Sequence, residues 1–262
     1  MIHRSPTTAL FALLLASQPV AAEGDAVPQP VTKPTTAPIN QAATEQPTEP
    51  LVKKISADIY QIGRVTFNKT TREISLPAHS NLLEAGTPLE FLLVHLNGEK
   101  VHESLLVTET DPTNLNIALK LLNYKESQEL FKPLLADGSR AEKEHVVADD
   151  IRKAARFTIH VSWKENGQKK SVPITQWLQH SVTGKPMPII PWVYSGSYMH
   201  RNRFKAKVNG NIFALLTNES AIANYPGADR HDDTLWLSPK NMAPEDTPIT
   251  ITITIKPWNG EL

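Results

Sequence analysis

The sequence contains no cysteine in its 262 residues. Disulfides, iron–sulfur clusters, zinc sites built on cysteine and a cysteine nucleophile are therefore all impossible. A lipid anchor is excluded as well, because a bacterial lipoprotein carries its lipid on a cysteine. Since exported proteins often rely on disulfides, this chain has to reach its stability through a packed core alone. We expect no cofactor.

The chain also lacks net charge and long apolar runs. Lys plus Arg and Asp plus Glu number 27 each, so no global field favours binding to nucleic acid. The apolar run Ala9–Ala16 has eight residues, too few to cross a hydrocarbon layer of about 30 Å. We therefore expect a soluble mature protein with no transmembrane segment and no nucleic-acid partner.

Residues 1–22 have the pattern of a signal peptide. Arg4 supplies a positive start, the apolar run follows, and Val20-Ala21-Ala22 offers small residues for cleavage after Ala22. The alternative is a buried N-terminal helix. The pattern predicts export to the periplasm or the extracellular space and a mature N-terminus at Glu23.

Residues 23–50 have the composition of a disordered linker. They contain six prolines together with Thr, Ala, Gln and Glu, and almost no large apolar residue. Such a segment cannot bury enough surface to offset the entropy lost on ordering. A core-like pattern begins at Leu51, so we expect one domain over residues 51–262.

Within that domain the predicted fold class is α+β, mostly antiparallel β hairpins with two to four short helices. Asn97-Gly98, Asn166-Gly167 and Asn209-Gly210 each separate two strand-like runs, which is a strong hairpin signal. A two-residue turn at the second site places Val161 opposite Val172, Trp163 opposite Lys170 and Ile159 opposite Ile174. Residues 248–256 alternate Ile with Thr, which predicts a strand with one buried face.

Helices are expected at a few places. Asp111 can cap a helix that has Pro112 at its first position and a stripe of Leu and Ala on one side. A second helix is expected over residues 125–135 and a short one over 175–182, whereas 139–155 is either helix or loop. Arg201, Arg203, Lys205 and Lys207 alternate along a predicted strand, where they form either a solvated face or a contact for an anionic polymer.

Three segments could carry chemistry. His102 and Glu103 begin an H-E-x-x-H pattern that fails at Leu106, so a zinc protease is excluded, and a polar surface patch is the alternative to a ligand site. Trp192, Tyr194 and Ser197 belong to an aromatic cluster beside a Gly-Ser turn, which indicates either a ligand platform or a core strand with its turn.

The third segment packs charged groups into a short loop. Arg230, His231, Asp232 and Asp233 lie between a Pro-Gly pair and a strand start. Carboxylates and imidazole bind metals and act as acids and bases, so His231, Asp232 and Asp233 are candidate metal ligands. The alternative is a solvated loop with local Asp turns.

With these segments in view, the domain resembles the YdjY-domain family of exported bacterial proteins over roughly residues 55–257. The resemblance rests on VHESLLVTE with the helix after it, on WVYSGS, and on AIANYPGADRHDDTLW. It implies export and one domain but no reaction, since the function of the family is not established. Some relatives are described as ferredoxin-like, an attribute that cannot transfer to a chain without cysteine.

Three functional hypotheses follow, of which the last is a purely structural envelope protein with no pocket. The first is a non-enzymatic module of the cell envelope that binds a small ligand or an envelope partner. The alternative is a metal-dependent or acid/base hydrolase that uses the loop 229–233, with His102 as a further candidate residue. An enzyme requires these groups to converge in one pocket with a perturbed titratable group.

Overall fold

Strands dominate the computed structural model, which describes residues 51–81, 83–239, 242–243 and 247–255. The predicted signal peptide and linker lie outside these residues. The strands are β1 (Lys53–Lys54), β2 (Ile59–Ile62), β3 (Val65–Asn68), β4 (Ile74–Ser80), β5 (Phe91–His95), β6 (Ser104–Thr108), β7 (Arg156–Glu165), β8 (Gln168–Pro173), β9 (Gln179–His180), β10 (Trp192–Tyr194), β11 (Met199–His200), β12 (Arg203–Phe204), β13 (Asn211–Ala214), β14 (Ala223–Asn224), β15 (Trp236–Leu237) and β16 (Ile249–Thr254).

Helices are short and few in the same residues. The α-helices are α1 (Pro112–Leu121), α2 (Asp149–Ala154) and α3 (Lys205–Asn209), and the 3-10 helices are η1 (Val101–Glu103) and η2 (Ile174–Trp177). Of the helices in the described residues, none has the length and apolarity needed to span a membrane.

Eight strands close into a barrel. They pair in the order β4–β16–β7–β10–β14–β13–β5–β6, and β6 pairs back with β4. Two of the neighbouring pairs, β5–β6 and β13–β14, are parallel. The predicted α+β arrangement of antiparallel hairpins is therefore wrong, because the fold is mostly β and its central feature is a closed barrel.

The alternating strand β16 confirms the sequence pattern. Ile249, Ile251 and Ile253 are at most 1% exposed and lie in the core, whereas the threonines between them lie on the other face. The strand pairs with β4 on one side and β7 on the other. Burying each isoleucine contributes about 1.5–3 kcal/mol, which explains why this strand holds a central place.

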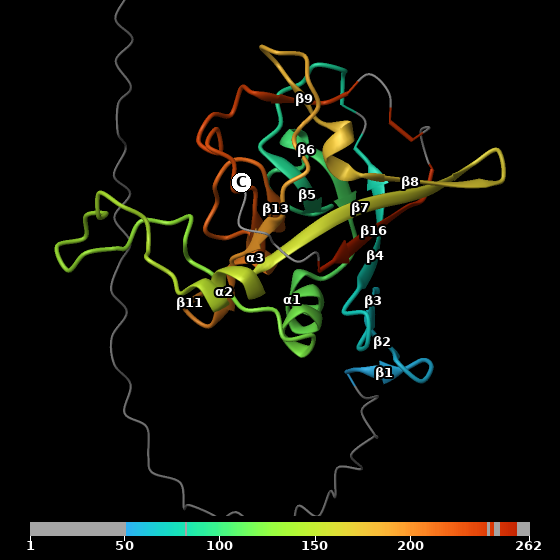
Figure 1. The fold of residues 1–262 in the computed structure, drawn as a ribbon, viewed down its shortest axis with the longest axis horizontal. Coiled ribbons are helices and arrows are strands. Elements are labelled where there is room, and N and C mark those ends of the chain that lie inside the picture. The colour runs from blue at the N-terminus through green and yellow to red at the C-terminus, as the bar shows by residue number, and fades with distance from the viewer. Residues whose placement is uncertain (1–50, 82, 240–241, 244–246, 256–262) are drawn as a thin grey trace, which may run out of the picture. The chain divides into compact units, whose positions relative to one another are not determined.

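One of the three predicted hairpins forms. β7 and β8 meet at Asn166-Gly167, and Val161 and Trp163 lie opposite Val172 and Lys170 as expected. Both turn residues have positive φ, as a type I′ turn requires. The ladder ends one pair early, at Pro173, because Ile174 begins η2 instead of pairing with Ile159. The hairpin projects beyond the barrel at the right of Figure 1.

The other two Asn-Gly pairs do not form hairpins. After Asn97-Gly98 the chain passes through η1 and returns as β6, parallel to β5. At the other site, the predicted strand of basic residues is β12 followed by α3, and Gly210 ends that helix in the left-handed conformation. The expectation for Asn209-Gly210 was wrong because Asn and Gly are favoured at helix ends as well as in hairpin turns. At the other site, Gly98 does not adopt the positive φ that a type I′ turn requires.

Gly98 and Gly210 instead allow two backbones to touch. A Cβ on Gly210 would lie 2.6 Å from the Cα of Gly98. Two hydrogen bonds join the segments, from the N–H of His95 to the carbonyl of Gly210 at 2.8 Å and from the N–H of Glu99 to that of Asn209 at 3.2 Å. This contact brings the start of β13 beside the end of β5.

Helix α1 confirms its predicted cap, since the Asp111 carboxylate accepts a hydrogen bond from the Thr113 N–H at 2.8 Å. The helix expected over residues 125–135 is absent and that segment is a loop. Residues 139–148 continue the loop, and α2 follows. The helix expected over 175–182 is reduced to η2, after which β9 begins. A long excursion therefore separates α1 from α2.

Candidate functional site

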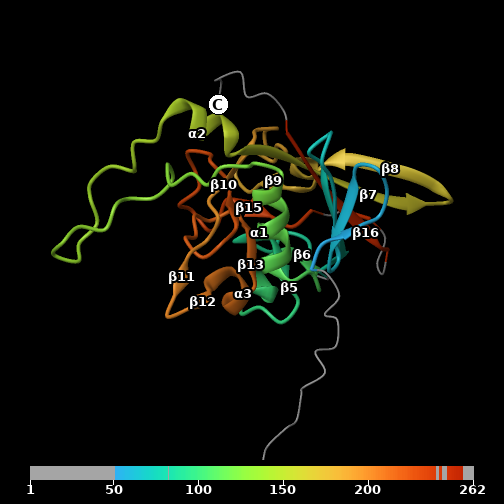
Figure 2. The ribbon, with the colours of Figure 1, turned by 90° about the horizontal axis from the view of Figure 1, so that it is seen from below.

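Residues 131–145, which we call the arm, form the outer part of this excursion. The arm doubles back on itself through hydrogen bonds from the N–H of His145 to the carbonyl of Phe131, from Ala141 to Pro133 and from Leu135 to Ser139, all at 2.8–2.9 Å. It projects at the left of Figure 1 and again in Figure 2. Most of its side chains are exposed, so few apolar contacts hold it in place.

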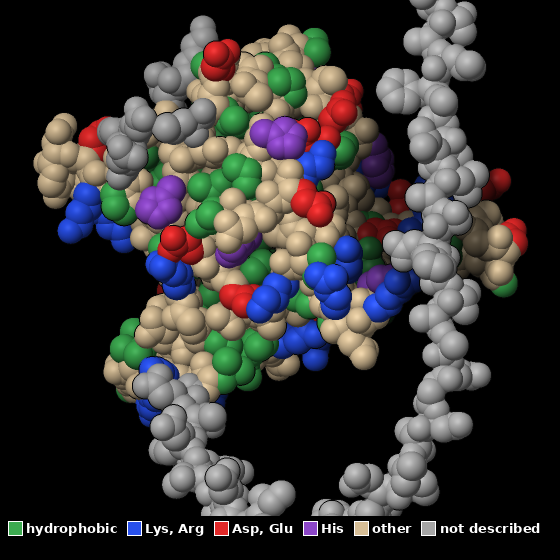
Figure 3. Space-filling model, turned by 180° about the vertical axis from the view of Figure 1, so that it is seen from behind, with side chains coloured by type: hydrophobic (Ala, Val, Ile, Leu, Met, Phe, Trp, Pro, Cys, Tyr) green, Lys and Arg blue, Asp and Glu red, His purple; other side chains and the backbone are tan. Residues whose placement is uncertain are grey.

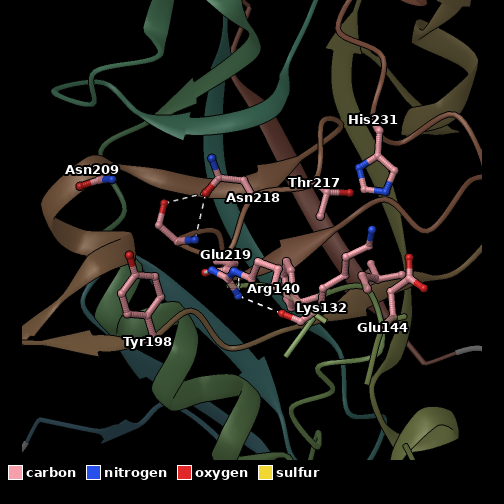
Figure 4. Close-up of a pocket in the computed structure, with 12 residues that line it drawn as sticks. Lys132, Arg140, Glu144, Tyr198, Asn209, Thr217, Asn218, Glu219 and His231 are labelled. Atoms are coloured by element: carbon pink, nitrogen blue, oxygen red, sulfur yellow. Dashed lines mark hydrogen bonds and ion pairs between the residues drawn. The ribbon is translucent and has the colours of Figure 1, made fainter. Parts of the chain in front are cut away.

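A cavity of about 470 Å³ lies between the arm and the barrel loops. The arm contributes Lys132, Arg140 and Glu144 to its wall. The segment 217–220, between β13 and β14, contributes threonine, asparagine, glutamate and serine side chains. His231 closes one side in Figure 4, and Tyr198 and Asn209 lie on the opposite side. Most of the lining residues are therefore polar, and Leu130 and Phe131 add apolar surface.

Two ion pairs hold the arm at the cavity. Arg140 contacts the Glu219 carboxylate through both terminal nitrogens, at 2.7 and 3.0 Å, and also donates a hydrogen bond to the carbonyl of Lys132 at 2.9 Å. Arg230 contacts Glu144 at 2.9 Å. Each carboxylate in the wall thus has an arginine partner.

Lys132 is the remaining cation of the wall. Its side chain extends toward His231 in Figure 4, and it forms no ion pair with any residue that the structure describes. Burial lowers the pKa of His231, and the positive charges of Arg230 and Lys132 lower it further against an opposing effect of Glu144. His231 is therefore a neutral imidazole at pH 7, with one donor and one acceptor nitrogen.

Of the predicted loop, only His231 lines the cavity. Arg230 contributes indirectly, by holding Glu144. Asp232 accepts hydrogen bonds from both the N–H and the hydroxyl of Thr234, at 2.9 and 2.6 Å, so its carboxylate closes a local turn. Asp233 is exposed. The roles assigned to these aspartates from sequence stay predictions.

The family of YdjY domains matches residues 65–254 of the chain. The chain belongs to this family. No curated protein and no solved structure matches it. The resemblance drawn from the sequence motifs is confirmed, and the structure shows what those motifs do in this YdjY domain.

The WVYSGS motif builds the interior of the YdjY domain. Trp192 is 1% exposed and packs against the rings of Phe213 and Tyr225. Tyr194 is fully buried, and its hydroxyl donates to the Asn116 side chain at 2.6 Å. These two residues stabilise the barrel, and their predicted role as a ligand platform gains no support from this placement.

The end of the same motif connects two neighbouring segments of the fold. Gly196 has a φ of 77°, which favours glycine, and a Cβ there would lie 2.3 Å from the carboxyl carbon of Glu126, so that side chain would have to move. Ser197 has a φ of 59°. Its hydroxyl donates to the carbonyl of Ser220 at 2.7 Å and accepts from the N–H of Ala206 at 3.0 Å. Ser197 therefore joins α3 to the segment that forms the cavity wall.

The AIANYPG motif supports the cavity from beneath. Asn224 is fully buried. Its side chain donates to Ser195 at 2.8 Å and accepts from the N–H of Asn218 at 2.7 Å. Asn218 in turn accepts hydrogen bonds from the N–H and the hydroxyl of Ser220. A buried network thus holds two polar groups of the wall in position.

His102 and Glu103 lie on η1, in a separate ionic cluster. Glu103 contacts Lys100 at 2.6 Å and His102 at 3.2 Å, and Lys100 also contacts Glu90 at 3.0 Å. Burial is the largest single effect and acts to raise the pKa of Glu103, but the hydrogen bonds with Lys100 and Glu90 and the nearby positive charges together outweigh it, and the pKa is lowered. The side chain of His102 is 71% exposed. A ligand-binding role for this pair stays a prediction.

The part of the chain that the structure describes contains no cluster of side chains that could bind a metal ion. No group of three or more His, Asp or Glu side chains is arranged there to hold an ion. The sequence analysis did not identify Lys132, Arg140 and Glu144 as candidate site residues. Arg140 reaches Glu219 from 79 residues away, and no local pattern indicates such a contact.

Proposed function

We propose that this YdjY domain is a non-enzymatic binding module of the cell envelope that takes a small polar ligand with an anionic group in the cavity. The volume of about 470 Å³ falls within the range of about 300–1,000 Å³ that is usual for small-molecule sites. Hydroxyl and amide groups of the wall, such as those of Thr217 and Asn218, offer both donors and acceptors.

The charge of the wall carries the proposal. Arg140 and Arg230 neutralise the two carboxylates, which leaves the Lys132 ammonium as a cation in excess. An anionic group in the cavity could therefore form a charge-assisted hydrogen bond with Lys132 without displacing an existing pair. The neutral imidazole of His231 adds a donor and an acceptor on the same side.

The position of the aspartates favours binding over hydrolysis. Asp232 and Asp233 do not line the cavity, and Asp232 is engaged with Thr234. The hydrolase hypothesis needs a carboxylate beside His231 that is not already paired, and Glu144 is paired with Arg230. For these reasons the binding hypothesis is the stronger one.

The test is calorimetric titration with matched ligands, such as glucuronate against glucose and glycerol phosphate against glycerol. We expect at least one anionic ligand to bind and its neutral counterpart to bind more weakly. Lys132→Gln should weaken that binding about 10- to 100-fold, since a hydrogen bond to a charged group contributes roughly 1.5–3 kcal/mol.

Lys143→Gln is the matched control, because Lys143 lies on the same exposed arm but does not line the cavity. Equal losses in the two variants, or equal binding of charged and neutral ligands, would contradict the proposal. Turnover of a bound ligand that His231→Gln abolishes would restore the hydrolase hypothesis.

A further inference from the structure

The charged residues are distributed unevenly along this chain. No aspartate or glutamate occurs between Glu165 and Glu219, although seven lysines and arginines do, four of them within residues 201–207. On the face shown in Figure 3, Lys and Arg side chains gather in the lower part of the described surface. The zero net charge of the chain therefore conceals a basic region.

The most concentrated part of this region is a small hairpin. Residues 198–205, which we call the basic hairpin, comprise β11, a two-residue turn and β12. His200 lies opposite Arg203 and Met199 opposite Phe204. The turn residues Arg201 and Asn202 have φ values of 47° and 58°. Asparagine tolerates that conformation, whereas arginine rarely adopts it, so a strained arginine sits at the tip.

Hydrogen bonds hold the base of the basic hairpin in place, and its tip is exposed to solvent. The N–H of Lys205 donates to the carbonyl of Tyr198 at 3.0 Å, and Ser197 below it is bonded to the segment 217–220. At the tip, His200, Arg201, Asn202 and Arg203 are all exposed. Lys207, just beyond, pairs with Asp111.

Cationic and apolar groups are exposed together on this hairpin. Arg201, Arg203 and Lys205 form no ion pair with any other described residue. Met199 is 62% and Tyr198 43% exposed. Exposure of the apolar Met199 side chain to water is unfavourable, and the three positive charges repel one another. Both unfavourable contributions become smaller where a negatively charged surface lies next to an apolar layer.

We propose that the basic hairpin docks this domain onto membranes that contain anionic phospholipid. Lysine and arginine beside such a surface are attracted to the headgroups, Tyr198 suits the boundary between water and lipid, and Met199 enters the adjacent acyl region. A soluble acidic glycan would satisfy the cations but would leave Met199 in water, so the exposed apolar groups favour the membrane.

The experiment is vesicle flotation of the full chain with phosphatidylcholine vesicles that contain either phosphatidylglycerol or no anionic lipid. We expect binding to the anionic vesicles that weakens as salt is raised. Each charge removed should lower the partition coefficient about fivefold, so the triple variant Arg201→Gln, Arg203→Gln, Lys205→Gln should lose about 100-fold.

The matched control removes three charges from the other hairpin, as Lys164→Gln, Lys169→Gln and Lys170→Gln. Because every protein compared has the same N-terminal apolar run, any contribution of Ala9–Ala16 cancels. The chain has no cysteine, so a single Met199→Cys can carry an environment-sensitive dye, with Gln168→Cys as its counterpart. The dye at position 199 should shift to the blue on anionic vesicles, and the dye at position 168 should not.

Three results would overturn the proposal. The first is equal binding by the hairpin triple and the control triple. The second is a dye at position 199 that stays in water while the protein floats with the vesicles. The third is binding to a soluble acidic polysaccharide, such as polygalacturonate, without binding to vesicles, which would identify the partner as a glycan.

Discussion

Conspicuous sequence motifs build the barrel interior around Trp192, whereas the arm contributes residues to the cavity that no motif marks. In the interior, Tyr194, Asn224 and Ser195 are buried and their polar groups bond to one another or to neighbouring strands. At the cavity, Arg140, Glu219 and Lys132 are exposed, and an ion pair joins Arg140 to Glu219.

This difference shows that a conspicuous sequence motif can reflect packing in the interior. A run such as WVYSGS is conspicuous because its aromatic residues fill a closed space, as the buried Trp192 and Tyr194 do. The arm has an ordinary charged composition, which a solvated loop would share. The proposed function rests instead on a surface whose exposed ion pairs can change partners, which is the arm.

The largest effect should come from the interior. Trp192→Ala should lower the free energy of unfolding by about 3–5 kcal/mol, because it removes a large ring from a packed aromatic cluster and leaves a cavity. Urea denaturation followed by circular dichroism measures the change.

Trp192→Phe is the control and should cost less, since part of the ring contact with Phe213 and Tyr225 is kept. If Trp192→Ala unfolds at the same urea concentration as the unchanged protein, the aromatic interior does not stabilise this domain, and the contrast drawn between the interior and the arm is wrong.

The features that sequence analysis predicted correctly have local causes. The isoleucine alternation of β16, the Asp111 cap and the turn at Asn166-Gly167 each depend on residues within a few positions of one another. Barrel closure does not, because it depends on the pairing of His79 in β4 with Val107 in β6. Without that contact, the same strands are read as separate hairpins, which is why the fold class was wrong.

The candidate site was predictable only in part for the same reason. His231 stood out because it lies among carboxylates in the sequence. Lys132 was expected in a helix over residues 125–135 and Arg140 in a segment that is either helix or loop, but both reach the cavity through the arm, whose position the contact with Glu219 fixes. A side chain that takes its role from a distant partner leaves no local pattern.

An intermediate effect is expected at Asp111, which caps α1 and also pairs with Lys207 of α3 at 2.7 Å. Asp111→Ala should cost about 1 kcal/mol at pH 7, as the loss of a cap usually does. Burial acts to raise the pKa of Asp111, but the hydrogen bonds from Lys207 and Thr113 outweigh it, so the pKa lies below its ordinary 3.8.

Because the folded-state pKa is lowered, the stabilisation by Asp111 is complete well above pH 3.8 and is lost as the pH falls through the folded value. Urea unfolding from pH 7 to pH 2 should therefore show the stability gap between Asp111→Ala and the unchanged protein closing in acid. Asp111→Asn, which can still cap the helix, should lose less at pH 7. A gap that persists at pH 2 would assign the effect to packing instead.

The smallest effect on stability should come from the arm, where Arg140→Gln breaks the pair with Glu219. Both side chains are nearly half exposed, and pairs of that kind contribute about 0–1 kcal/mol. The local effect should be larger, because Arg140 also bonds to the carbonyl of Lys132 and few apolar contacts replace it. Trypsin should then cut after Lys143 faster than in the unchanged protein, while urea unfolding hardly moves.

Arg64→Gln serves as the control for that cleavage, since it breaks an exposed pair with Glu109 and should leave the arm intact. If Arg140→Gln costs several kcal/mol, the arm unfolds together with the barrel and belongs to the same cooperative unit. If cleavage after Lys143 does not change, the pair with Glu219 does not hold the arm. Only faster cleavage at nearly constant stability keeps the arm distinct from the interior, as a ligand site with exchangeable partners requires.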